Sequence, residues 1–336
     1  MKIFGWQVDH SGCFHYRLRL PFDQLRAQGH DAFYGADLAR VDLDGVDVVV
    51  GQRVTLPGPS RWWQAEARRG NRLLVYETDD DLAHIDPGNT AALAFLAPDL
   101  QANYRRNLAV AGLVTVSTDH LAEVISEFTT APVVVLPNRI PRWLTEHEPT
   151  RRTDVVTVGW AGSTSHAVDW EEVSGAVRRF VLRNPGTELH TFGMHHTAAG
   201  RRSQVHGATH AAWVNTRHSP WEKNLNSFFR ALDFHVGLAP LRPSVFNRSK
   251  SAVKALEYAA LGIPVVASNT GPYPGFVRDG ETGYLVDRPH EWDGALRALL
   301  FESLRAEMGA AARAEAKKHL VEDHARDWAD AYEKAR

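Results

Sequence analysis

The feature that most constrains how this chain can fold is an alternation of short β-branched strands with helices. Five apolar runs in the first half read as strands: residues 2–8, 46–54, 71–77, 112–118 and 131–138. Helical patterns separate them, at 20–29, 59–70, about 99–109 and 119–128. Strands that are apolar throughout are typical of a parallel sheet covered on both faces. The first half therefore predicts one α/β domain ending near residue 138.

The same alternation begins again after residue 154. Its strands are expected at 155–163, 187–193, 233–241, 264–268 and 282–286, and its helices at 169–186, 221–232 and 246–260, followed by a last helical region. Residues 139–154 between the halves are proline-rich, charged and aperiodic, which suits a linker. We expect domains at 1–145 and 150–320, with a helix at about 322–336 that can pack back on the first. Two such sheets leave a cleft between the carboxyl ends of their strands, where ligands bind in open α/β folds.

Charge and composition exclude some classes of protein. The net charge is −2 and the pI is near 6.8, so no bulk positive field gathers nucleic acid, although arginine pairs at 68–69, 151–152 and 201–202 allow a local basic groove. Cys13 is the single cysteine, so no intramolecular disulfide can form. No signal-peptide core and no run of 18 apolar residues are present, so we expect a cytoplasmic protein without a transmembrane segment. No G-x-G-x-x-G follows a strand, which argues against a Rossmann oxidoreductase.

The segment 246–268 carries charge within an apolar run. On a helix, Lys250, Lys254 and Glu257 stand at i, i+4 and i+7 and share a narrow arc. One interpretation is a solvated face with a Lys254–Glu257 pair. The other is a ridge that faces a ligand, because the helix starts in a loop at the cleft, where its dipole and free N–H groups favour an anion.

The segment that follows the first lysine carries a family resemblance. "KALEYAALGIPVVASNTGPYPGFVRDGETGYLV", residues 254–286, resembles the donor-site segment of GT-B-fold glycosyltransferases, especially retaining family 4, the glycosyl transferases group 1. "LRAQGHDA", "GLVTVSTDHLAEVI" and "VVVLPNRIP" in the first half are similar to further parts of that family. The resemblance implies two Rossmann-like doubly wound domains facing a cleft. It also implies a nucleotide-diphospho sugar as co-substrate, with no further cofactor and no metal.

The resemblance implies roles for residues on the donor side. Glu257 matches the second glutamate of the family's E-x7-E motif, which accepts hydrogen bonds from both ribose hydroxyls of the nucleotide. The first glutamate of that motif is replaced here by Ser249. Contact with the donor sugar can then involve Ser249 itself, Asn247 or Arg248.

The diphosphate of the donor needs cationic or backbone donors. Lys250 and Lys254 are the candidates, with Arg248 behind them, because charge-assisted donors suit phosphate oxygens. The turn at 159–163 is a second candidate, since Gly162 and Ser163 can bring backbone amides close to a phosphate. The alternative for that turn is an ordinary tight connection between strand and helix.

The first half is expected to supply the acceptor side. The loop after the first strand carries His10, His15, Tyr16 and Arg17, which we expect to line the cleft and bind the acceptor. The alternative for any one of these histidines is exposure to solvent, because the chain contains 17 of them.

Three successive aspartates at 79–81 follow the strand expected at 71–77, and His84 comes three residues later. Three successive acids repel one another, so the pKa of one of them can be raised. The alternatives are a role in orienting the acceptor or acting as a base, N-capping of a helix beginning near Leu82, and a metal site. The candidates are Asp79 for binding the acceptor, and Asp80, His84 and Lys254 for catalysis.

These observations lead to one main hypothesis for function: a metal-independent glycosyltransferase that uses a nucleotide-diphospho sugar and retains the anomeric configuration. An alternative is an inverting enzyme of the same fold with an aspartate as general base. An alternative of another class is a non-catalytic protein that binds a sugar nucleotide. The acceptor stays open among a glycan, a natural product, a protein and a modified base in viral DNA.

Overall fold

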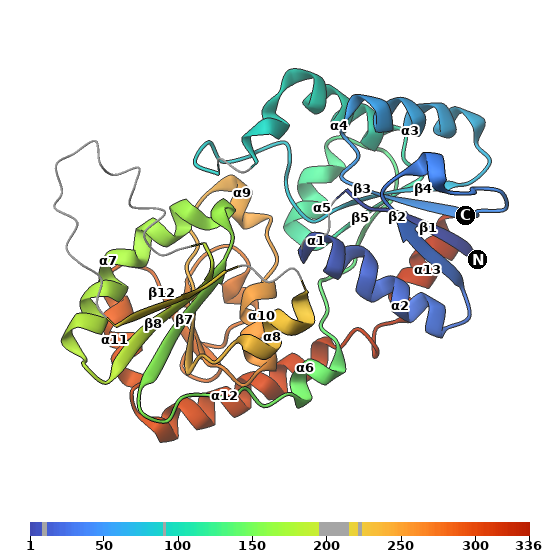
Figure 1. Ribbon diagram of the computed structural model, residues 1–336. Helices are drawn as coiled ribbons and strands as arrows, with labels where there is room; N and C mark the ends of the chain where they lie inside the picture. Colours follow the sequence, from blue (N-terminus) through green and yellow to red (C-terminus); the bar gives the residue numbers. More distant parts are fainter. Residues whose placement is uncertain (9–11, 90–91, 195–214, 221–223) are drawn as a thin grey trace.

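The computed structural model describes residues 1–8, 12–89, 92–194, 215–220 and 224–336, and it has two α/β domains (Figure 1). The sheet of the N-terminal domain is parallel throughout, in the order β2-β1-β3-β4-β5-β6. Its strands are β1 (Lys2–Trp6), β2 (Asp31–Gly35), β3 (Val48–Gln52), β4 (Leu73–Thr78), β5 (Leu113–Val116) and β6 (Val133–Val135). The main helices between them are α1 (Gly12–Phe14), α2 (Leu20–Ala27), α3 (Pro57–Arg69), α4 (Pro98–Ala109) and α5 (Asp119–Ser126). A π-helical turn, His15–Arg19, joins α1 to α2.

The C-terminal domain holds a second parallel sheet, in the order β12-β11-β10-β7-β8-β9. Its strands are β7 (Val156–Gly162), β8 (Thr187–Gly193), β9 (Thr216–Ser219), β10 (Val236–Ala239), β11 (Val265–Ser268) and β12 (Gly283–Val286). Its helices are α7 (Ala167–Arg183), α8 (Leu225–Ala231), α9 (Val245–Arg248), α10 (Val253–Ala260), α11 (Glu291–Ala298) and α12 (Glu302–Ala316). The predicted fold class, two Rossmann-like sheets of the GT-B type, is confirmed.

Each sheet has one point where the order of its strands reverses. In the N-terminal sheet this point lies between β1 and β3, and in the C-terminal sheet it lies between β7 and β10. Loops that leave the carboxyl ends of such strands run in opposite directions and open a crevice between them. The loops after β1, β3 and β4 of one domain meet the loops after β7 and β10 of the other, as the residues lining their shared cavity demonstrate.

The chain crosses between the domains twice. The first crossing carries the short helix α6 (Arg142–Glu146), so the segment expected to be aperiodic is partly helical. The second crossing follows α12 and leads to α13 (Arg326–Ala335), which packs against α2 and β4 of the N-terminal domain. The two crossings pair with each other: Ile140 N–H donates to the carbonyl of His319 at 3.1 Å, and Val321 N–H donates to that of Ile140 at 2.9 Å.

Apolar packing continues across the domain boundary. One buried cluster contains Trp328 and Tyr332 of α13, side chains of α2 and β1, and the inner faces of α8 and α10. The outer faces of the two sheets each carry a cluster of their own. Gly159 in the middle of β7 is required by this packing, since a Cβ there would lie 1.9 Å from Cγ of Phe234. This glycine therefore makes room for a phenyl ring and not for a phosphate.

Two predicted helices are wrong in detail. The single helix expected at 246–260 is interrupted between α9 and α10, where the carbonyl of Ser249 accepts a hydrogen bond from Oγ1 of Thr118 in the other domain. The helix expected near Leu82 is an irregular turn. There, Oδ1 of Asp81 accepts from the N–H groups of Ala83 and His84, both at 3.1 Å. The edge strands β2 and β9 were not predicted, since both are short and incompletely buried.

Candidate active site

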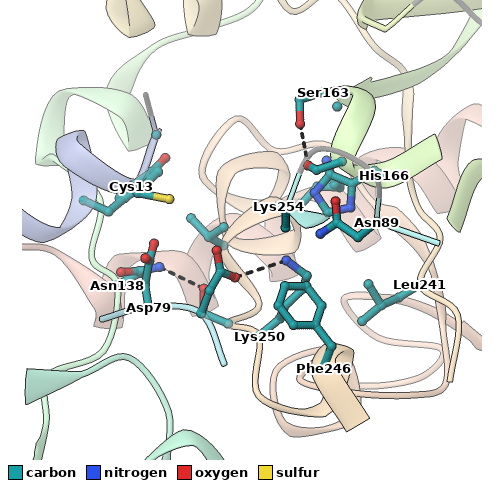
Figure 2. Close-up of a pocket in the computed structure, with 18 of the residues that line it drawn as sticks. Cys13, Asp79, Asn89, Asn138, Ser163, His166, Leu241, Phe246, Lys250 and Lys254 are labelled. Carbon is teal, nitrogen blue, oxygen red and sulfur yellow. Dashed lines mark hydrogen bonds and ion pairs between the residues drawn. The ribbon is translucent and has the colours of Figure 1, made fainter. Parts of the chain in front are cut away.

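A cavity of about 540 Å³ lies between the two domains. Its polar lining residues are Cys13, Tyr16, Arg53, Asp79, Asp80, Asn89, Asn138, Ser163, Ser165, His166, Lys250, Ser251, Lys254, Glu257 and Tyr273. Its apolar lining includes Leu82, Phe95, Leu225, Phe228, Leu241 and Phe246. In Figure 2, Cys13 and Asp79 lie on one side of this space, Ser163 and His166 lie on the other, and Lys250 lies between them. A volume of this size accommodates a small organic ligand.

Glu257 enters the cavity from α10. Burial raises its pKa to about 7, although a hydrogen bond from Tyr16 and the charge of Lys254 both act to lower it. The bond from Tyr16 crosses between the domains, with the phenol oxygen 2.5 Å from Oε1 of Glu257. This geometry favours the alternative in which the helix face meets a ligand, because Glu257 lines the cavity between the domains.

Lys254 stands one turn before Glu257 on the same helix. Its ammonium donates to the carbonyl of Ala161 at the end of β7, and it lies 5.9 Å from the ring centroid of Trp160. Burial lowers the pKa of Lys254, while the nearby charges of Glu257 and Asp169 partly offset that effect. A cation held against the carboxyl end of a strand is well placed to meet an anion in the cleft.

Lys250 lies in the break between α9 and α10, and its ammonium is 3.3 Å from Oδ1 of Asp80. Arg53, at the end of β3, approaches the other oxygen of Asp80 at 3.6 Å. Burial alone would raise the pKa of Asp80, but Lys250 and Arg53 together hold it below its ordinary value. Burial would likewise lower the pKa of Lys250, and Asp80 and Asp169 raise it instead. Both groups are therefore charged at neutral pH.

The turn after β7 supplies Gly162 and Ser163 to the cavity, and it continues into His166. Glycine at position 162 leaves room for an indole, because a Cβ there would lie 2.5 Å from the ring of Trp160. Nδ1 of His166 pairs with Oδ2 of Asp169 at 2.9 Å. Burial lowers the pKa of His166, assisted by the two lysines, so its imidazole is neutral at pH 7.

Three of the predicted donor-side residues do not line this cavity. Asn247 is buried, and its amide donates to Oδ1 of Asp169 at 3.0 Å and to the carbonyl of Arg242 at 2.8 Å. Ser249 is fully buried beside Asp81, with 3.5 Å between the two side-chain oxygens. Arg248 is exposed and borders an adjoining cavity of about 380 Å³, which shares Lys250 and Ser251 with the first. The stretch therefore contributes to the site through Phe246, Lys250 and Ser251, and not through Asn247, Arg248 or Ser249.

The predicted acceptor loop is buried where the structure describes it. His15 packs its ring against Tyr16 and Phe229, and burial lowers its pKa to about 4. Arg17 is fully buried and forms a bidentate pair with Glu77, at 2.7 and 3.1 Å. The placement of His15 and Arg17 on a loop lining the cleft is therefore wrong. His10 lies outside the described residues.

The acidic run divides between two environments. Asp79 and Asp80 line the cavity, whereas Asp81 is fully buried and holds the turn described above. His84 is partly exposed and does not line the cavity, and its Nδ1 lies 3.0 Å from Oδ2 of Asp81. A catalytic role for His84 has no support in this geometry. Near the cavity wall, Sγ of Cys13 and carboxylate oxygens of Asp79 and Asp80 lie within 4.8 Å of one another, a spacing that a metal ion could bridge.

Several lining residues were not predicted from the sequence. Arg53 and Asn89 belong to loops that carried no motif, although Arg53 directly follows a buried strand, which is a usable signal for a residue at a cleft. Asn89 is 5% exposed, and its side-chain oxygen has no hydrogen-bond partner among the described residues. His166 follows the predicted glycine turn, but it was not predicted to line the cavity.

Part of this chain matches a known protein family. Residues 155–302 match the model for the family described as glycosyl transferases group 1, which covers most of the C-terminal domain and confirms the resemblance there. The D-inositol 3-phosphate glycosyltransferase of Rhodococcus opacus (strain B4) is 46% identical over 67 residues, which are 19% of this chain and 14% of that protein. The enzyme of the same name from Acidothermus cellulolyticus is 47% identical over 94 residues, 27% of this chain and 19% of that protein. The matched region is thus a small part of these relatives' own length.

Solved structures resemble the whole chain. HepE of Anabaena in complex with UDP has a TM-score of 0.68 at 12% identity, with 98% of both chains covered. The sucrose-phosphate synthase of Thermosynechococcus elongatus has a TM-score of 0.66 at 14% identity, with 99% of both chains covered. At such low identity the likeness establishes the GT-B fold. Among the described residues, no helix has the length and apolar character needed to cross a bilayer.

Proposed function

We propose that this protein is a glycosyltransferase that moves a sugar from a nucleotide-diphospho donor to an acceptor hydroxyl, with retention of configuration and without a metal ion. The observation that carries the proposal is the convergence of Glu257, Lys254 and Lys250 on one cavity between the two domains. Their chemistry suits the parts of such a donor: a carboxylate for a diol, and two ammonium groups for a diphosphate.

The nucleoside end of the donor is assigned to Glu257. An ionised carboxylate offers about four acceptor sites on two oxygens, enough to take both hydroxyls of a ribose. Leu225 and Phe228 of α8 line the same cavity and offer apolar surface to a base. HepE, which shares the fold, has been solved with UDP and with UDP-glucose. Uridine nucleotides are therefore the first donors to test.

The diphosphate is assigned to Lys250 and Lys254. The first turn of α10 lies beside them and has no side-chain cap, so its N–H groups are suited to bind a phosphate oxygen. As the glycosidic bond breaks, negative charge accumulates on the leaving phosphate. Cations fixed in a water-poor cleft stabilise that charge without reorganising. These groups take the place that a divalent ion holds in metal-dependent transferases.

Retention is favoured over inversion by the charge environment of Asp80. An inverting enzyme needs a general base that removes the acceptor proton, and a carboxylate with a lowered pKa is a weak base. In the retaining reaction the bond from the anomeric carbon to the phosphate oxygen breaks while the acceptor oxygen bonds to that carbon on the same face. The acceptor proton passes to the leaving phosphate, which becomes the nucleoside diphosphate product. No protein nucleophile is needed.

A thermal-shift screen tests the proposal directly. UDP, GDP, ADP, CMP and dTDP, each alone and as a sugar derivative, are added to the purified chain and the melting temperature is measured. A nucleotide present at 100 times its dissociation constant stabilises the folded state by about 2.7 kcal/mol. We expect one nucleotide to raise the melting temperature, and its sugar derivative to be hydrolysed slowly.

The controls separate binding from catalysis. Lys318→Ala removes an exposed lysine that does not line the cavity, and should behave as the wild type. Lys254→Ala should keep most of the shift in melting temperature and lose most of the hydrolysis. Binding with no hydrolysis or transfer under any condition would identify a non-catalytic sugar-nucleotide-binding protein instead. If no nucleotide binds, the proposed function is wrong.

A further inference from the structure

One hydrogen bond joins the two halves of the cleft at the proposed ribose site. The hydroxyl of Tyr16 donates to Oε1 of Glu257 at 2.5 Å, over a sequence separation of 241 residues. Tyr16 belongs to the π-helical turn of the N-terminal domain, and Glu257 belongs to α10 of the C-terminal domain. Both side chains line the cavity. A residue expected on the acceptor side therefore contacts the donor side.

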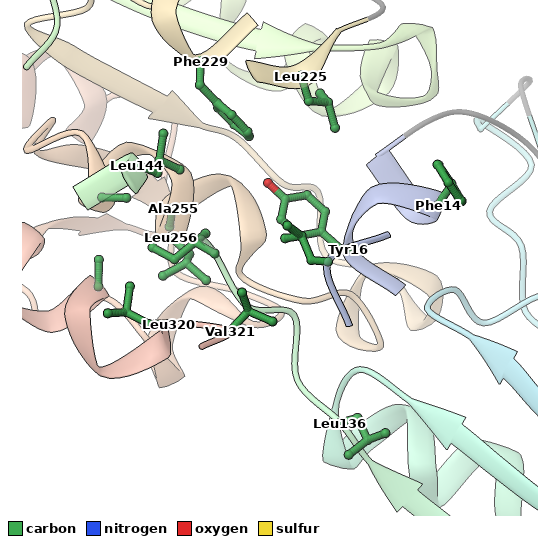
Figure 3. Close-up of a cluster of buried hydrophobic side chains, with 14 of the residues drawn as sticks. Phe14, Tyr16, Leu136, Leu144, Leu225, Phe229, Ala255, Leu256, Leu320 and Val321 are labelled. Carbon is green, nitrogen blue, oxygen red and sulfur yellow. The ribbon is translucent and has the colours of Figure 1, made fainter. Parts of the chain in front are cut away.

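The tyrosine ring is held in place by its neighbours. Tyr16 is 4% exposed and meets His15 edge-on, with 5.0 Å between the ring centroids. It belongs to the apolar cluster that also contains Leu225, Phe229 and Leu256 of the other domain (Figure 3). Figure 3 shows its hydroxyl pointing from the N-terminal domain toward the C-terminal side chains. Moving that hydroxyl away would disrupt apolar contacts between the domains, so it is a fixed donor.

The hydrogen bond from Tyr16 leaves acceptor sites on the Glu257 carboxylate free for a nucleotide. Tyr16 uses one of about four acceptor sites of an ionised carboxylate, and a vicinal diol needs two. The tyrosine and the ribose can therefore bind Glu257 together. A donor fixed on Oε1 restricts rotation of the carboxylate, which lowers the entropy lost when the ribose binds.

We propose that Tyr16 is a positioning residue for the donor nucleotide, holding the Glu257 carboxylate across the cleft in the orientation that accepts the ribose hydroxyls. This inference rests on the proposed function. It also connects the N-terminal domain to donor affinity, because the C-terminal domain binds the nucleotide with full affinity only when the N-terminal domain supplies this hydroxyl.

The charge state of Glu257 provides a readout that packing alone would not change. The ionisable groups facing Glu257 are Tyr16, Lys254, Tyr258 and Tyr273. Burial raises the pKa of all three tyrosines, so they stay neutral across the range of interest, while burial lowers the pKa of Lys254. With its own pKa at about 7, Glu257 gains a proton below neutrality and loses acceptor capacity. Loss of the tyrosine hydroxyl raises that pKa further.

The experiment titrates UDP-glucose by calorimetry between about pH 5.5 and pH 9, because its diphosphate diester keeps a constant charge there. Wild-type affinity should rise with pH, with a midpoint near 7. For Tyr16→Phe we expect affinity about tenfold weaker near pH 7, a midpoint moved to higher pH, and a smaller difference at pH 9. Tyr34→Phe, a partly exposed tyrosine of the same domain outside the cavity, is the matched control.

Further variants keep the test decisive. Tyr16→Leu removes the same hydroxyl with a different packing, so it should move the midpoint in the same direction even if one variant folds poorly. Glu257→Gln should abolish the pH dependence, and adding Tyr16→Phe to it should change little. Affinity and midpoint equal to wild type in Tyr16→Phe, or tighter binding, would overturn the inference and leave the proposed function standing. If none of the nucleotides and sugar derivatives of the thermal-shift screen binds the wild type, both are overturned.

Discussion

The ammonium of Lys250 lies 3.3 Å from Oδ1 of Asp80, and this ion pair joins the two domains across the cleft. Arg53 lies 3.6 Å from the second oxygen of the same carboxylate. Asp80 therefore pairs with the same cation that we assign to the donor diphosphate. A bound diphosphate and Asp80 compete for Lys250, so the pair couples donor binding to the contact between the domains.

Asp80→Asn distinguishes a structural acid from a catalytic one. Because Lys250 and Arg53 hold its pKa low, we expect turnover to fall less than about tenfold, far below the 10²–10⁴ contribution typical of a general base. Steady-state kinetics measure the change, and NMR of the product should report the donor's anomeric configuration. A loss of several hundredfold together with an inverted product would establish the alternative in which Asp80 is the base.

Lys254→Ala should lower turnover more than it weakens donor binding. The contribution of this cation grows as charge develops on the leaving phosphate, and removing one such donor costs on the order of 10²–10³ in rate. Turnover numbers and donor dissociation constants are compared with those of Lys318→Ala. Normal turnover with a slightly lower melting temperature would instead make Lys254 a purely structural partner of the Ala161 carbonyl.

The buried carboxyl of Glu257 should make the free energy of unfolding depend on pH. Its pKa is about 7 in the folded protein and near 4.5 when unfolded, so the folded state binds this proton more tightly. Its contribution to stability is complete below about pH 4.5 and is lost as pH rises to about 7. In Glu257→Gln, stability relative to wild type should rise across that window by about 1–3 kcal/mol.

Urea unfolding at a series of pH values measures this difference, with the exposed Glu123→Gln as the control. A constant difference between Glu257→Gln and wild type across the window would mean that the carboxyl is not buried in the way described.

Removal of metal ions should leave activity intact. Two lysines and the first turn of α10 supply the positive charge that the diphosphate needs, so turnover in excess EDTA should equal that in buffer. The measurement is a donor-hydrolysis or transfer assay with and without chelator. If activity disappears and Mg²⁺ or Mn²⁺ restores it, the cluster of Cys13, Asp79 and Asp80 becomes the candidate metal site.

The architecture could be predicted from the sequence because its signals are local. Apolar β-branched runs such as those of β3 and β10 mark central strands, which are buried on both faces. Two of the four edge strands, β2 and β9, escaped prediction because neither carries a continuous β-branched run. Prediction therefore succeeded at the centre of each sheet and at the edge strands β6 and β12, and failed at the other two edges.

The site could be predicted only in part, because its geometry depends on contacts between distant residues. Lys254 and Glu257 share one helix, so their spacing placed them together correctly. Lys250 reaches the same cavity from the break between α9 and α10, where Thr118, 131 residues away, donates a hydrogen bond to the Ser249 carbonyl. Arg17 was expected to line the cleft. It instead pairs with Glu77, 60 residues away in the sequence, inside the N-terminal domain. No local sequence pattern predicts contacts between residues so far apart in the chain.

The return of α13 to the N-terminal domain has a consequence for how this protein can be recombined. Trp328 and Tyr332 complete the packing of a domain whose other residues precede position 140, so that domain is built from both ends of the described chain. A chimera that exchanges the first 145 residues for those of a relative would join a foreign sheet to the original helix and mismatch their surfaces. An exchange that carries residues 321–336 as well would preserve that interface. The unit that can be inherited or transplanted intact is thus the C-terminal domain, cut once at each crossing.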